Sequence, residues 1–367
     1  MIKIETLSKS FNEKKVLNNL NVEIQKNKIT ALLGPNGSGK TTLLNIIAGL
    51  LNPDQGNIYI NNLMVHGTIG TKKVNLKPFE RQIGYVFQTN ALFPHMKIQD
   101  NITYGLKSLH LSKAEIKKRT NTMLKLVDLT EYAQAYPNQL SGGQQQRAAL
   151  ARSLATEPQI ILLDEPVSAV DPQYKETFRQ ELKKYLQTLE ITTIYVTHNL
   201  NEAFMMADNI AILGNGHIEQ IGNKKEIFDK PQSEYVAKFT GTNILKGKAT
   251  KQQNKQHIQI ETNNNTLLTT TSTNTELIGK NVTITIKPED ITLTTKKPTN
   301  TNNSNITNTL QGTITEIIQM HSTTQITVDI GFPIKTKITP TMIKKLEATI
   351  GDTVYITFNP STLNIFT

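Results

Sequence analysis

The spacing of hydrophobic positions divides the chain into two parts. Short continuous apolar runs at 29–33 (ITALL) and 160–163 (IILL) have the length and composition of strands buried on both faces of a parallel sheet. The segment 113–128 instead has its apolar residues at helical spacing. After about residue 241 the period becomes two, as in NVTITIK at 281–287. This pattern predicts an α/β domain followed by a small all-β domain.

Length and charge agree with this division. The chain has 367 residues, and a single core stops growing at roughly 250 residues. We therefore expect domains at 1–240 and 241–367. The net charge is +10, of which residues 241–367 contribute +4 (12 Lys against 8 Asp and Glu), leaving +6 for residues 1–240. Because this charge is spread over both domains, it does not favour a nucleic-acid partner.

Cysteine is absent from the chain, which excludes disulfides, thiolate metal sites and thiol chemistry. The initial MIKIETLSKSF contains no apolar signal core. The longest apolar stretch, LLNIIAGLL at 43–51, is far shorter than the roughly 20 residues that span a bilayer. We therefore expect a cytosolic chain.

A glycine-rich stretch, GPNGSGKTT at 34–42, lies between the apolar run 29–33 and the apolar helix predicted at 43–51. This is the context of a phosphate loop, whose glycines let backbone N–H groups point at phosphate oxygens near a helix N-terminus. Lys40 would neutralise the outer phosphates and Thr41 would reach Mg²⁺. The predicted nucleotide-binding residues of the loop are Gly34, Pro35, Asn36, Gly37, Ser38, Gly39, Lys40, Thr41 and Thr42.

Two adjacent carboxylates end the second buried run, in IILLDEP at 160–166. Acidic residues at a strand end are costly unless they serve a site, although a solvated turn is the alternative. We assign Asp164 to the Mg²⁺ water shell and Glu165 to accept a proton from the attacking water. A further apolar run ends at His198, which by itself is more typical of a surface position than of a nucleotide contact.

The phosphate loop, Gln88 in GYVFQ, LSGGQ at 140–144, ILLDEP, SAVD and the final TH, in this order, resemble the ATP-binding cassette family over residues 1 to about 240. The resemblance implies a P-loop NTPase fold, with a RecA-like core and a helical subdomain at about 89–158. It also implies an ATPase that uses ATP and Mg²⁺ and is coupled to transmembrane transport.

The resemblance also implies roles for single residues. Phe11 would stack on adenine, and Gln88 would sense the metal ion and the attacking water. Glu165 would be the catalytic base and His198 the switch histidine at the γ-phosphate. The implied metal-site residues are Thr41, Gln88 and Asp164.

The second glycine motif comprises Ser141, Gly142, Gly143 and Gln144, at the start of a predicted helix, QQQRAALARSLA. Its three glutamines and its arginine are not residues that core packing would require. The exposed N–H groups of the helix start and the Ser141 hydroxyl would form a second anion-binding cap. In the ATP-binding cassette family this cap closes over the nucleotide of a partner cassette. One set of motifs therefore implies a head-to-tail homodimer around two ATP molecules.

The helical subdomain places Ile116, Met123, Leu124 and Val127 on one face of the helix predicted at 113–128. Its simplest role is packing around the helix that carries LSGGQ. The resemblance implies a second role, which is to receive short helices of separate transmembrane permease subunits. In an importer, those subunits receive substrate from an extracytoplasmic substrate-binding protein. We then expect the chain at the cytoplasmic face of the cell membrane.

The C-terminal domain contains an internal repeat. GKNVTITIKPEDITL at 279–293 and GDTVYITFNPSTLNI at 351–365 share Gly, Val, Ile-Thr, Pro and two closing aliphatic residues at the same offsets. We expect two β modules, at about 244–295 and 310–367, joined by a flexible Thr- and Asn-rich linker at 295–309. They resemble the OB-like, oligomer-binding (TOBE/Mop-like) regulatory modules of ATPases that serve oxyanion and some sugar or metal importers.

The transported substrate is expected to be a tetrahedral oxyanion. DIGFPIKTKIT at 329–339 resembles most the modules of molybdate, tungstate and sulfate importers. Molybdate or tungstate is the first expectation, and sulfate or thiosulfate is the alternative; the oxyanion would also bind the C-terminal domain. Two other hypotheses are a soluble cassette that acts on nucleic acid or ribosomes, and a binding module whose cassette is secondary. The first of these usually has two cassettes or a long coiled-coil insertion, neither of which this sequence contains.

Overall fold

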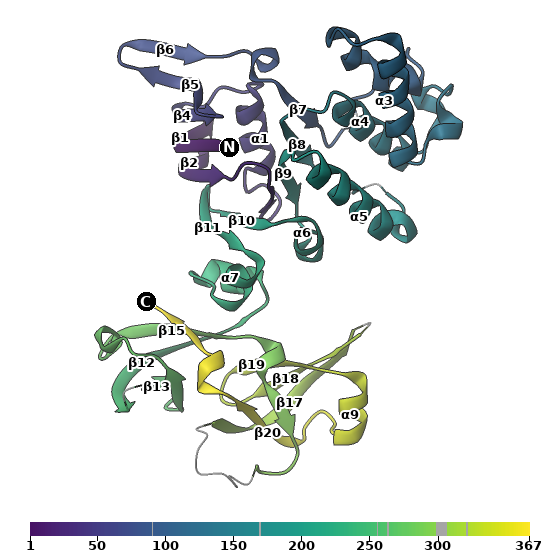
Figure 1. Ribbon diagram of the computed structural model, residues 1–367. Helices are drawn as coiled ribbons and strands as arrows, with labels where there is room; N and C mark the ends of the chain where they lie inside the picture. Colours follow the sequence, from purple (N-terminus) through teal and green to yellow (C-terminus); the bar gives the residue numbers. More distant parts are fainter. Residues whose placement is uncertain (90, 169, 255, 263, 299–306, 321) are drawn as a thin grey trace. The chain divides into compact units, whose positions relative to one another are not determined.

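The computed structural model describes every residue of the chain except 90, 169, 255, 263, 299–306 and 321. It comprises two compact units, Met1–Lys224 and Lys225–Thr367 (Figure 1). The N-terminal unit contains two hydrophobic clusters and the C-terminal unit contains one.

The division between the units falls earlier in the chain than the predicted position at 240. Two short helices, α7 (Lys224–Asp229) and α8 (Glu234–Phe239), lead into the second unit. Asp229 pairs with Lys287, and Glu234 pairs with Lys246, each at 2.5 Å. These ion pairs attach the helices to the β strands that follow, a connection that the local sequence pattern does not reveal.

The centre of the N-terminal unit is a six-stranded sheet in the order β11-β10-β3-β9-β8-β7. Its strands are β3 (Ile29–Leu33), β7 (Ile83–Val86), β8 (Ile160–Asp164), β9 (Thr192–Thr197), β10 (Asn209–Gly214) and β11 (His217–Asn223). All pairs are parallel except β10 with β11. Every residue of β3, β8 and β9 is buried, as the continuous apolar runs predict.

A second, antiparallel sheet in the order β2-β1-β4-β5-β6 shares a core with the first. Its strands are β1 (Ile2–Phe11), β2 (Lys14–Ile24), β4 (Gln55–Ile60), β5 (Leu63–Ile69) and β6 (Lys72–Asn75). The phosphate-loop helix α1 (Lys40–Ala48) contributes Leu44 to this core, together with Leu7 of β1 and Leu162 of β8. The helix ends before the predicted residue 51, because Gly49 adopts a left-handed conformation at its C-terminus.

The helical part of this unit packs around α4, as predicted (Figure 1). Its elements are α2 (Ile98–Thr103), η2 (Tyr104–Ser108), α3 (Lys113–Leu126), η3 (Thr130–Tyr132), η4 (Pro137–Gln139) and α4 (Gly142–Ala155). Met123, Leu124 and Val127 are buried in its core, and Ile116 packs against them partly buried. The remaining elements of the unit are η1 (Pro78–Arg81), α5 (Pro172–Thr188) and α6 (Leu200–Met206).

The C-terminal unit contains the predicted repeat as two five-stranded antiparallel sheets. The first module supplies β12 (Asn243–Asn254), β13 (His257–Thr262), β14 (Leu267–Thr271), η5 (Thr275–Leu277), β15 (Asn281–Ile286), η6 (Pro288–Asp290) and β16 (Thr292–Thr294). The second supplies β17 (Asn308–Gln319), β18 (Thr324–Asp329), β19 (Pro333–Ile338), α9 (Pro340–Leu346), β20 (Thr353–Phe358), η7 (Pro360–Thr362) and β21 (Asn364–Phe366). The linker predicted at 295–309 falls mostly on residues 299–306, which lie outside the described residues, and β17 already begins at Asn308.

Each sheet takes its last strand from the other module. The sheet orders are β14-β13-β12-β15-β21 and β19-β18-β17-β20-β16. The terminal β21 therefore pairs with β15 of the first module, and β16 pairs with β20 of the second. Apolar residues of both modules form one shared core. The two predicted modules thus interlock.

Two asparagines at equivalent positions connect the modules. The Asn243 side chain accepts a hydrogen bond from the Lys335 N–H and donates one to the Lys335 carbonyl, both at 2.8 Å. Asn308 accepts from the Thr269 N–H at 2.7 Å and donates to the Thr269 carbonyl at 2.8 Å. Each asparagine side chain therefore hydrogen-bonds to a backbone N–H and a backbone carbonyl of the other module, which the sheet of that module leaves unpaired.

We predict that Asn308→Ala destabilises the C-terminal unit by about 2–4 kcal/mol, because it leaves two backbone groups of a buried residue without partners, each costing about 1–3 kcal/mol. The measurement is denaturant unfolding of the full chain. The exposed Asn281→Ala, at the start of β15, is the control and should change the free energy of unfolding by about 0.5 kcal/mol at most. Equal losses in both variants would contradict the connection.

Candidate nucleotide-binding site

The loop between β3 and α1 is shaped by close backbone contacts. A Cβ atom added to Gly34 would lie 2.5 Å from the Leu213 carbonyl oxygen, so only glycine fits beside β10. Gly39 caps α1 with φ of +101°, in the left-handed region, and an added Cβ would meet Leu17 at 2.9 Å. The sequence therefore forces a tight turn whose backbone leads directly into the N-terminus of α1.

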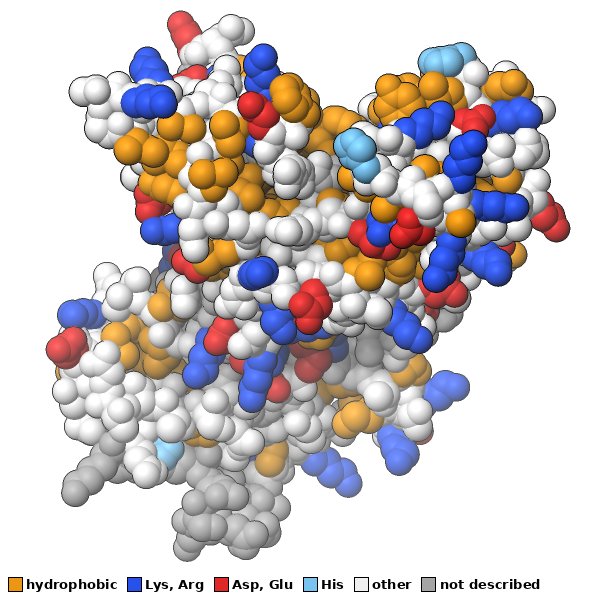
Figure 2. Space-filling view, turned by 45° about the horizontal axis from the view of Figure 1, so that its top comes forward, with side chains coloured by type: hydrophobic (Ala, Val, Ile, Leu, Met, Phe, Trp, Pro, Cys, Tyr) orange, Lys and Arg blue, Asp and Glu red, His pale blue; other side chains and the backbone are white. Residues whose placement is uncertain are grey.

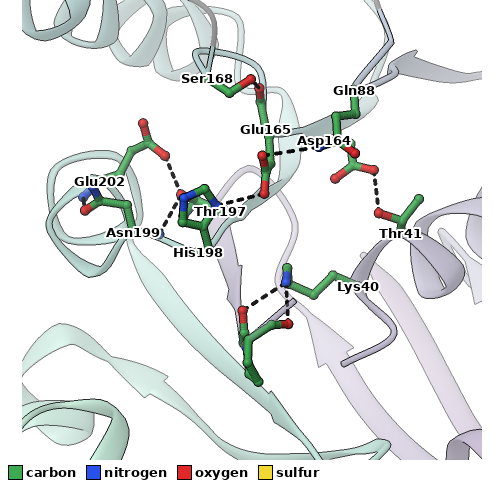
Figure 3. A network of polar contacts seen from close by, with 12 residues as sticks. Lys40, Thr41, Gln88, Asp164, Glu165, Ser168, Thr197, His198, Asn199 and Glu202 are labelled. Atoms are coloured by element: carbon green, nitrogen blue, oxygen red, sulfur yellow. Dashed lines mark hydrogen bonds and ion pairs between the residues drawn. The ribbon is translucent and has the colours of Figure 1, made fainter. Parts of the chain in front are cut away.

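Lys40 lies inside this turn. Its side chain is buried, and Nζ donates to the carbonyl oxygens of Gly34 and Pro35, both at 2.9 Å (Figure 3). Burial lowers the pKa of Lys40, while the nearby Glu165 and Asp164 act in the opposite direction. The turn thus holds a cation next to two carboxyl groups at the end of β8.

Asp164 is the last residue of β8 and is buried. Its Oδ2 accepts a hydrogen bond of 2.8 Å from the Thr41 hydroxyl, whereas Oδ1 is buried without a partner among the described residues (Figure 3). Burial raises the pKa of Asp164, and the Thr41 hydrogen bond opposes this shift. Such an unsatisfied carboxylate oxygen is costly to bury unless a further group binds it.

Glu165 follows immediately and has a left-handed backbone, with φ of +49°. Its Oε1 lies 2.9 Å from His198 Nδ1, and its Oε2 accepts from Gln88 Nε2 at 3.5 Å (Figure 3). Gln88 follows β7 and His198 follows β9, so the ends of neighbouring parallel strands converge on one carboxylate. The three side chains to which the family resemblance assigns roles in hydrolysis therefore lie together, and those roles stay predictions.

A cavity of about 470 Å³ contains these groups. It is lined by Phe11, Val16, Asn36, Gly37, Gly39, Lys40, Thr41, Thr42, Gln88, Asp164, Glu165 and His198. Gly34, Pro35 and Ser38 are in the loop but do not line the cavity, and the Ser38 hydroxyl is buried without a partner among the described residues. Phe11 is half exposed at the end of β1, with Lys9 Nζ 5.6 Å from its ring centre.

The second glycine motif lies elsewhere. A separate cavity of about 420 Å³ is lined by Ser141, Gly142, Gly143, Gln144, Arg147, Val170, Asp171 and Tyr174. Ser141 caps α4: its hydroxyl accepts from the Gln144 N–H at 3.4 Å, and Gln144 Oε1 accepts from the Ser141 N–H at 2.9 Å. Apart from Gly34, Pro35 and Ser38, the predicted site residues therefore form two groups that line different cavities.

The residues after the cap have structural roles that the sequence analysis missed. Gln146 is buried, and its Nε2 donates to the Glu165 carbonyl at 2.8 Å. Gln145 Nε2 donates to the carbonyls of Pro137 and Leu140, and Arg147 Nη1 donates to the Val127 carbonyl at 2.9 Å. The expectation that packing does not require these side chains is therefore wrong. These three consecutive residues point to different sides of α4, so no periodic pattern in the sequence indicates the contacts.

Comparison with known proteins identifies the family of this chain. The family model described as ABC transporter matches residues 17–168. A probable sulfate/thiosulfate import ATP-binding protein of Chlorella vulgaris is 42% identical over 240 residues, covering 65% of this chain and 98% of the relative. The chain belongs to the ABC transporter family. As a member of the family's importer type, it is an ATPase whose activity is coupled to transport.

Other relatives of this ABC transporter ATPase differ in substrate. A spermidine/putrescine import ATP-binding protein of Bacillus cereus is 41% identical over 245 residues, covering 67% of this chain and 72% of the relative. A solved ATP-binding cassette, a dimer in a post-hydrolysis state bound to ADP and phosphate, has a TM-score of 0.54 and 36% identity, covering 61% of this chain and 98% of its own. These likenesses confirm the P-loop NTPase fold.

The cavity of the ABC transporter ATPase suits its nucleotide. Backbone N–H groups at the start of α1 and the Lys40 ammonium can receive phosphates, and the half-exposed Phe11 ring can receive a base. Across the described residues, no helix is long and apolar enough to cross a membrane.

We predict that Asp164→Asn raises the melting temperature of the nucleotide-free protein at pH 7. Because the pKa of Asp164 is raised, its contribution to the free energy of unfolding is largest below the ordinary pKa and is lost as pH rises through the folded-state pKa. Asparagine does not ionise, so the gain should shrink below about pH 4. A gain of about 1 kcal/mol in the free energy of unfolding would raise the melting temperature by about 2–4 °C.

The matched control is Asp128→Asn, which changes a carboxylate whose side chain is 90% exposed. It should leave the melting temperature nearly unchanged across the same pH range. A lower melting temperature for Asp164→Asn at pH 7 would show that the buried carboxylate is stabilising.

Proposed function

We propose that this ATPase subunit powers the import of a tetrahedral oxyanion and that Glu165 is its catalytic base. The observation that carries the catalytic part is the position of the Glu165 carboxylate, between Gln88 and His198 and in the same cavity as Lys40. An ionised carboxylate only accepts hydrogen bonds, so the Gln88 amide and the His198 ring hold it as an acceptor at the cavity wall.

The same cavity fits Mg²⁺ bound together with ATP. Thr41 Oγ1, Asp164 Oδ1 and the Gln88 side chain would provide the hard oxygen donors that Mg²⁺ prefers, directly or through water. When bound, the metal neutralises charge on the phosphoryl group that is transferred. Lys40 adds positive charge on the phosphate side, and Glu165 accepts a proton from the attacking water. His198 would orient Glu165 and would contact the terminal phosphate of bound ATP.

A second copy of the chain would complete the site. The two groups of predicted nucleotide ligands line different cavities, so one molecule leaves its Ser141 cap unused. In a symmetric head-to-tail pair, each cap covers the nucleotide that the other copy holds. The helix N-terminus at Ser141 then adds N–H donors to the phosphates of the partner's ATP.

The membrane permease subunits would bind a groove of the N-terminal unit. A cavity of about 840 Å³ lies between η1, the end of β4 and β5 on one side and η2 on the other. Phe79 is 76% exposed there, and Leu63 and Leu109 are also exposed. Figure 2 shows hydrophobic side chains gathered around this hollowed face. Exposed apolar side chains that gather around one groove are typical of a protein interface. The proposed location is the cytoplasmic membrane face, with an extracytoplasmic binding protein delivering substrate to the permease.

Molybdate or tungstate is the proposed substrate, because the C-terminal repeat resembles the modules of such importers. The specific alternative is sulfate or thiosulfate, which the name of the Chlorella relative supports.

We further propose that the oxyanion binds the TOBE/Mop-like C-terminal unit and inhibits the ATPase. Lys337 pairs with Glu289 at 2.8 Å. Lys335 of the same strand has no ion-pair partner among the described residues. The simpler role of this unit is packing between two copies.

We predict that Glu165→Gln binds ATP with an affinity close to that of the natural protein but hydrolyses it at least about 100-fold more slowly, since the amide keeps the shape and cannot accept the proton. The measurement combines nucleotide titration with phosphate release. Glu157→Gln, outside the cavity, is the control and should retain normal turnover. Near-normal turnover by Glu165→Gln would remove the residue from this role.

We predict that the cognate oxyanion stabilises the full-length protein and lowers its ATPase rate. At about 100 times its Kd, a ligand that binds only the folded state adds about 2.7 kcal/mol. Thermal unfolding is measured with molybdate, tungstate, sulfate and phosphate, with ATPase rates in the same series. Stabilisation by sulfate alone would favour the alternative substrate. Identical unfolding and ATPase rates with all four anions would leave packing as the role of the C-terminal unit.

A further inference from the structure

The backbone of Glu165 is held from several directions. Its φ of +49° is unusual for a residue with a side chain, and such conformations persist only where surrounding contacts impose them. The Glu165 N–H donates to the Val196 carbonyl of β9 at 3.2 Å. Its carbonyl accepts from the Ser168 hydroxyl at 3.0 Å and the Ser168 N–H at 3.2 Å (Figure 3).

The remaining contact comes from α4. Gln146 is 1% exposed, and its Nε2 donates to the Glu165 carbonyl at 2.8 Å and to the Ser168 hydroxyl at 3.1 Å. A side-chain amide has two N–H donors, so one nitrogen can serve both acceptors. The amide therefore reaches both ends of the turn that follows Asp164.

The position of Gln146 on α4 connects this turn to the Ser141 cap. Gln146 comes five residues after Ser141, the N-cap of the same helix, which corresponds to about 7.5 Å along the helix axis. A helix is rigid over this distance. Any displacement of the cap by a bound partner therefore moves the Gln146 amide and the Glu165 carbonyl with it.

We infer that Gln146 is a positioning residue for ATP hydrolysis: it fixes the backbone of Glu165 from the helix that carries the Ser141 cap. The carboxylate then points correctly only when α4 is in place, which links occupation of the cap to the chemistry in the same chain. This inference rests on the proposed role of Glu165 as the base. Gln146 itself does not line the nucleotide cavity.

The alternative is that Gln146 only stabilises the core. Its neighbour provides the comparison, because Gln145 Nε2 also donates to two acceptors, the carbonyls of Pro137 and Leu140, neither of which belongs to the Glu165 turn. Gln146→Met and Gln145→Met remove the same amide from adjacent positions and retain side-chain length. They differ in whether the lost contact holds Glu165.

The experiment measures kcat, the KM for ATP, and ATP-dependent dimerisation in the Glu165→Gln background. Gln146→Met should lower kcat about 10- to 100-fold, the loss expected from small misplacement of a reacting group. It should keep KM within about twofold and should dimerise normally. Gln145→Met should keep kcat within about threefold. Normal kcat for Gln146→Met, or equal losses of kcat in both variants, would overturn the inference.

A second variant covers the case in which Gln146→Met does not fold. Ser168 is exposed, so Ser168→Ala should fold normally while removing the hydroxyl between Gln146 and the Glu165 carbonyl. We expect a severalfold lower kcat with unchanged KM, and an unchanged kcat would count against the inference. Glu165→Gln is assayed in parallel: if it hydrolyses ATP normally, the proposed base is wrong and the inference fails with it. If Glu165→Gln loses hydrolysis but Gln146→Met and Ser168→Ala keep a normal kcat, the inference fails while the proposed base stands.

Discussion

The end of β8 imposes the constraint on which the N-terminal unit depends. Within two residues it places a left-handed backbone at Glu165 and a buried carboxylate, Asp164, one oxygen of which has no partner in the part of the chain that the structure describes. Backbone strain of this kind costs on the order of 1–3 kcal/mol. The five buried residues of β8, paired on both sides with β7 and β9, keep the strand in place against this cost. A site that binds a charged ligand explains why the cost persists.

Helix α4 connects the second glycine motif to the nucleotide site. Its N-terminus presents the Ser141 cap, while its body contacts the segments that carry Gln88 and Glu165. The Ser153 hydroxyl donates to the Tyr85 carbonyl at 2.9 Å, and Arg152 donates to the Ala91 carbonyl at 2.8 Å. Tyr85 and Ala91 flank Gln88 in the sequence. Gln146 reaches the Glu165 turn. One helix therefore connects the Ser141 cap with the segments that hold Gln88 and Glu165, the two side chains that would handle the attacking water.

Local patterns in the sequence predicted the strands and the phosphate loop because those features depend on residues close together in the chain. The continuous apolar runs gave β3 and β8, and the glycine spacing gave the loop before α1. The contact between Gln146 and Glu165 spans 19 residues, and no periodicity reveals it. The exchange of β16 and β21 was equally hidden, since three-residue strands have no pattern of their own and packing in the shared core determines their partners.

Each nucleotide site would be shared between two copies of the chain, which a crosslinking experiment tests directly. Because the sequence contains no cysteine, single introduced cysteines report contacts without background. Asn36→Cys, in the phosphate loop, and Gly142→Cys, where an added Cβ meets nothing within 4 Å, are placed on separate chains that both carry Glu165→Gln. Mixed under oxidising conditions, the two proteins should form a disulfide-linked heterodimer when ATP is added and little without it. The absence of that ATP-dependent heterodimer, with both proteins folded and binding ATP, would contradict the shared site.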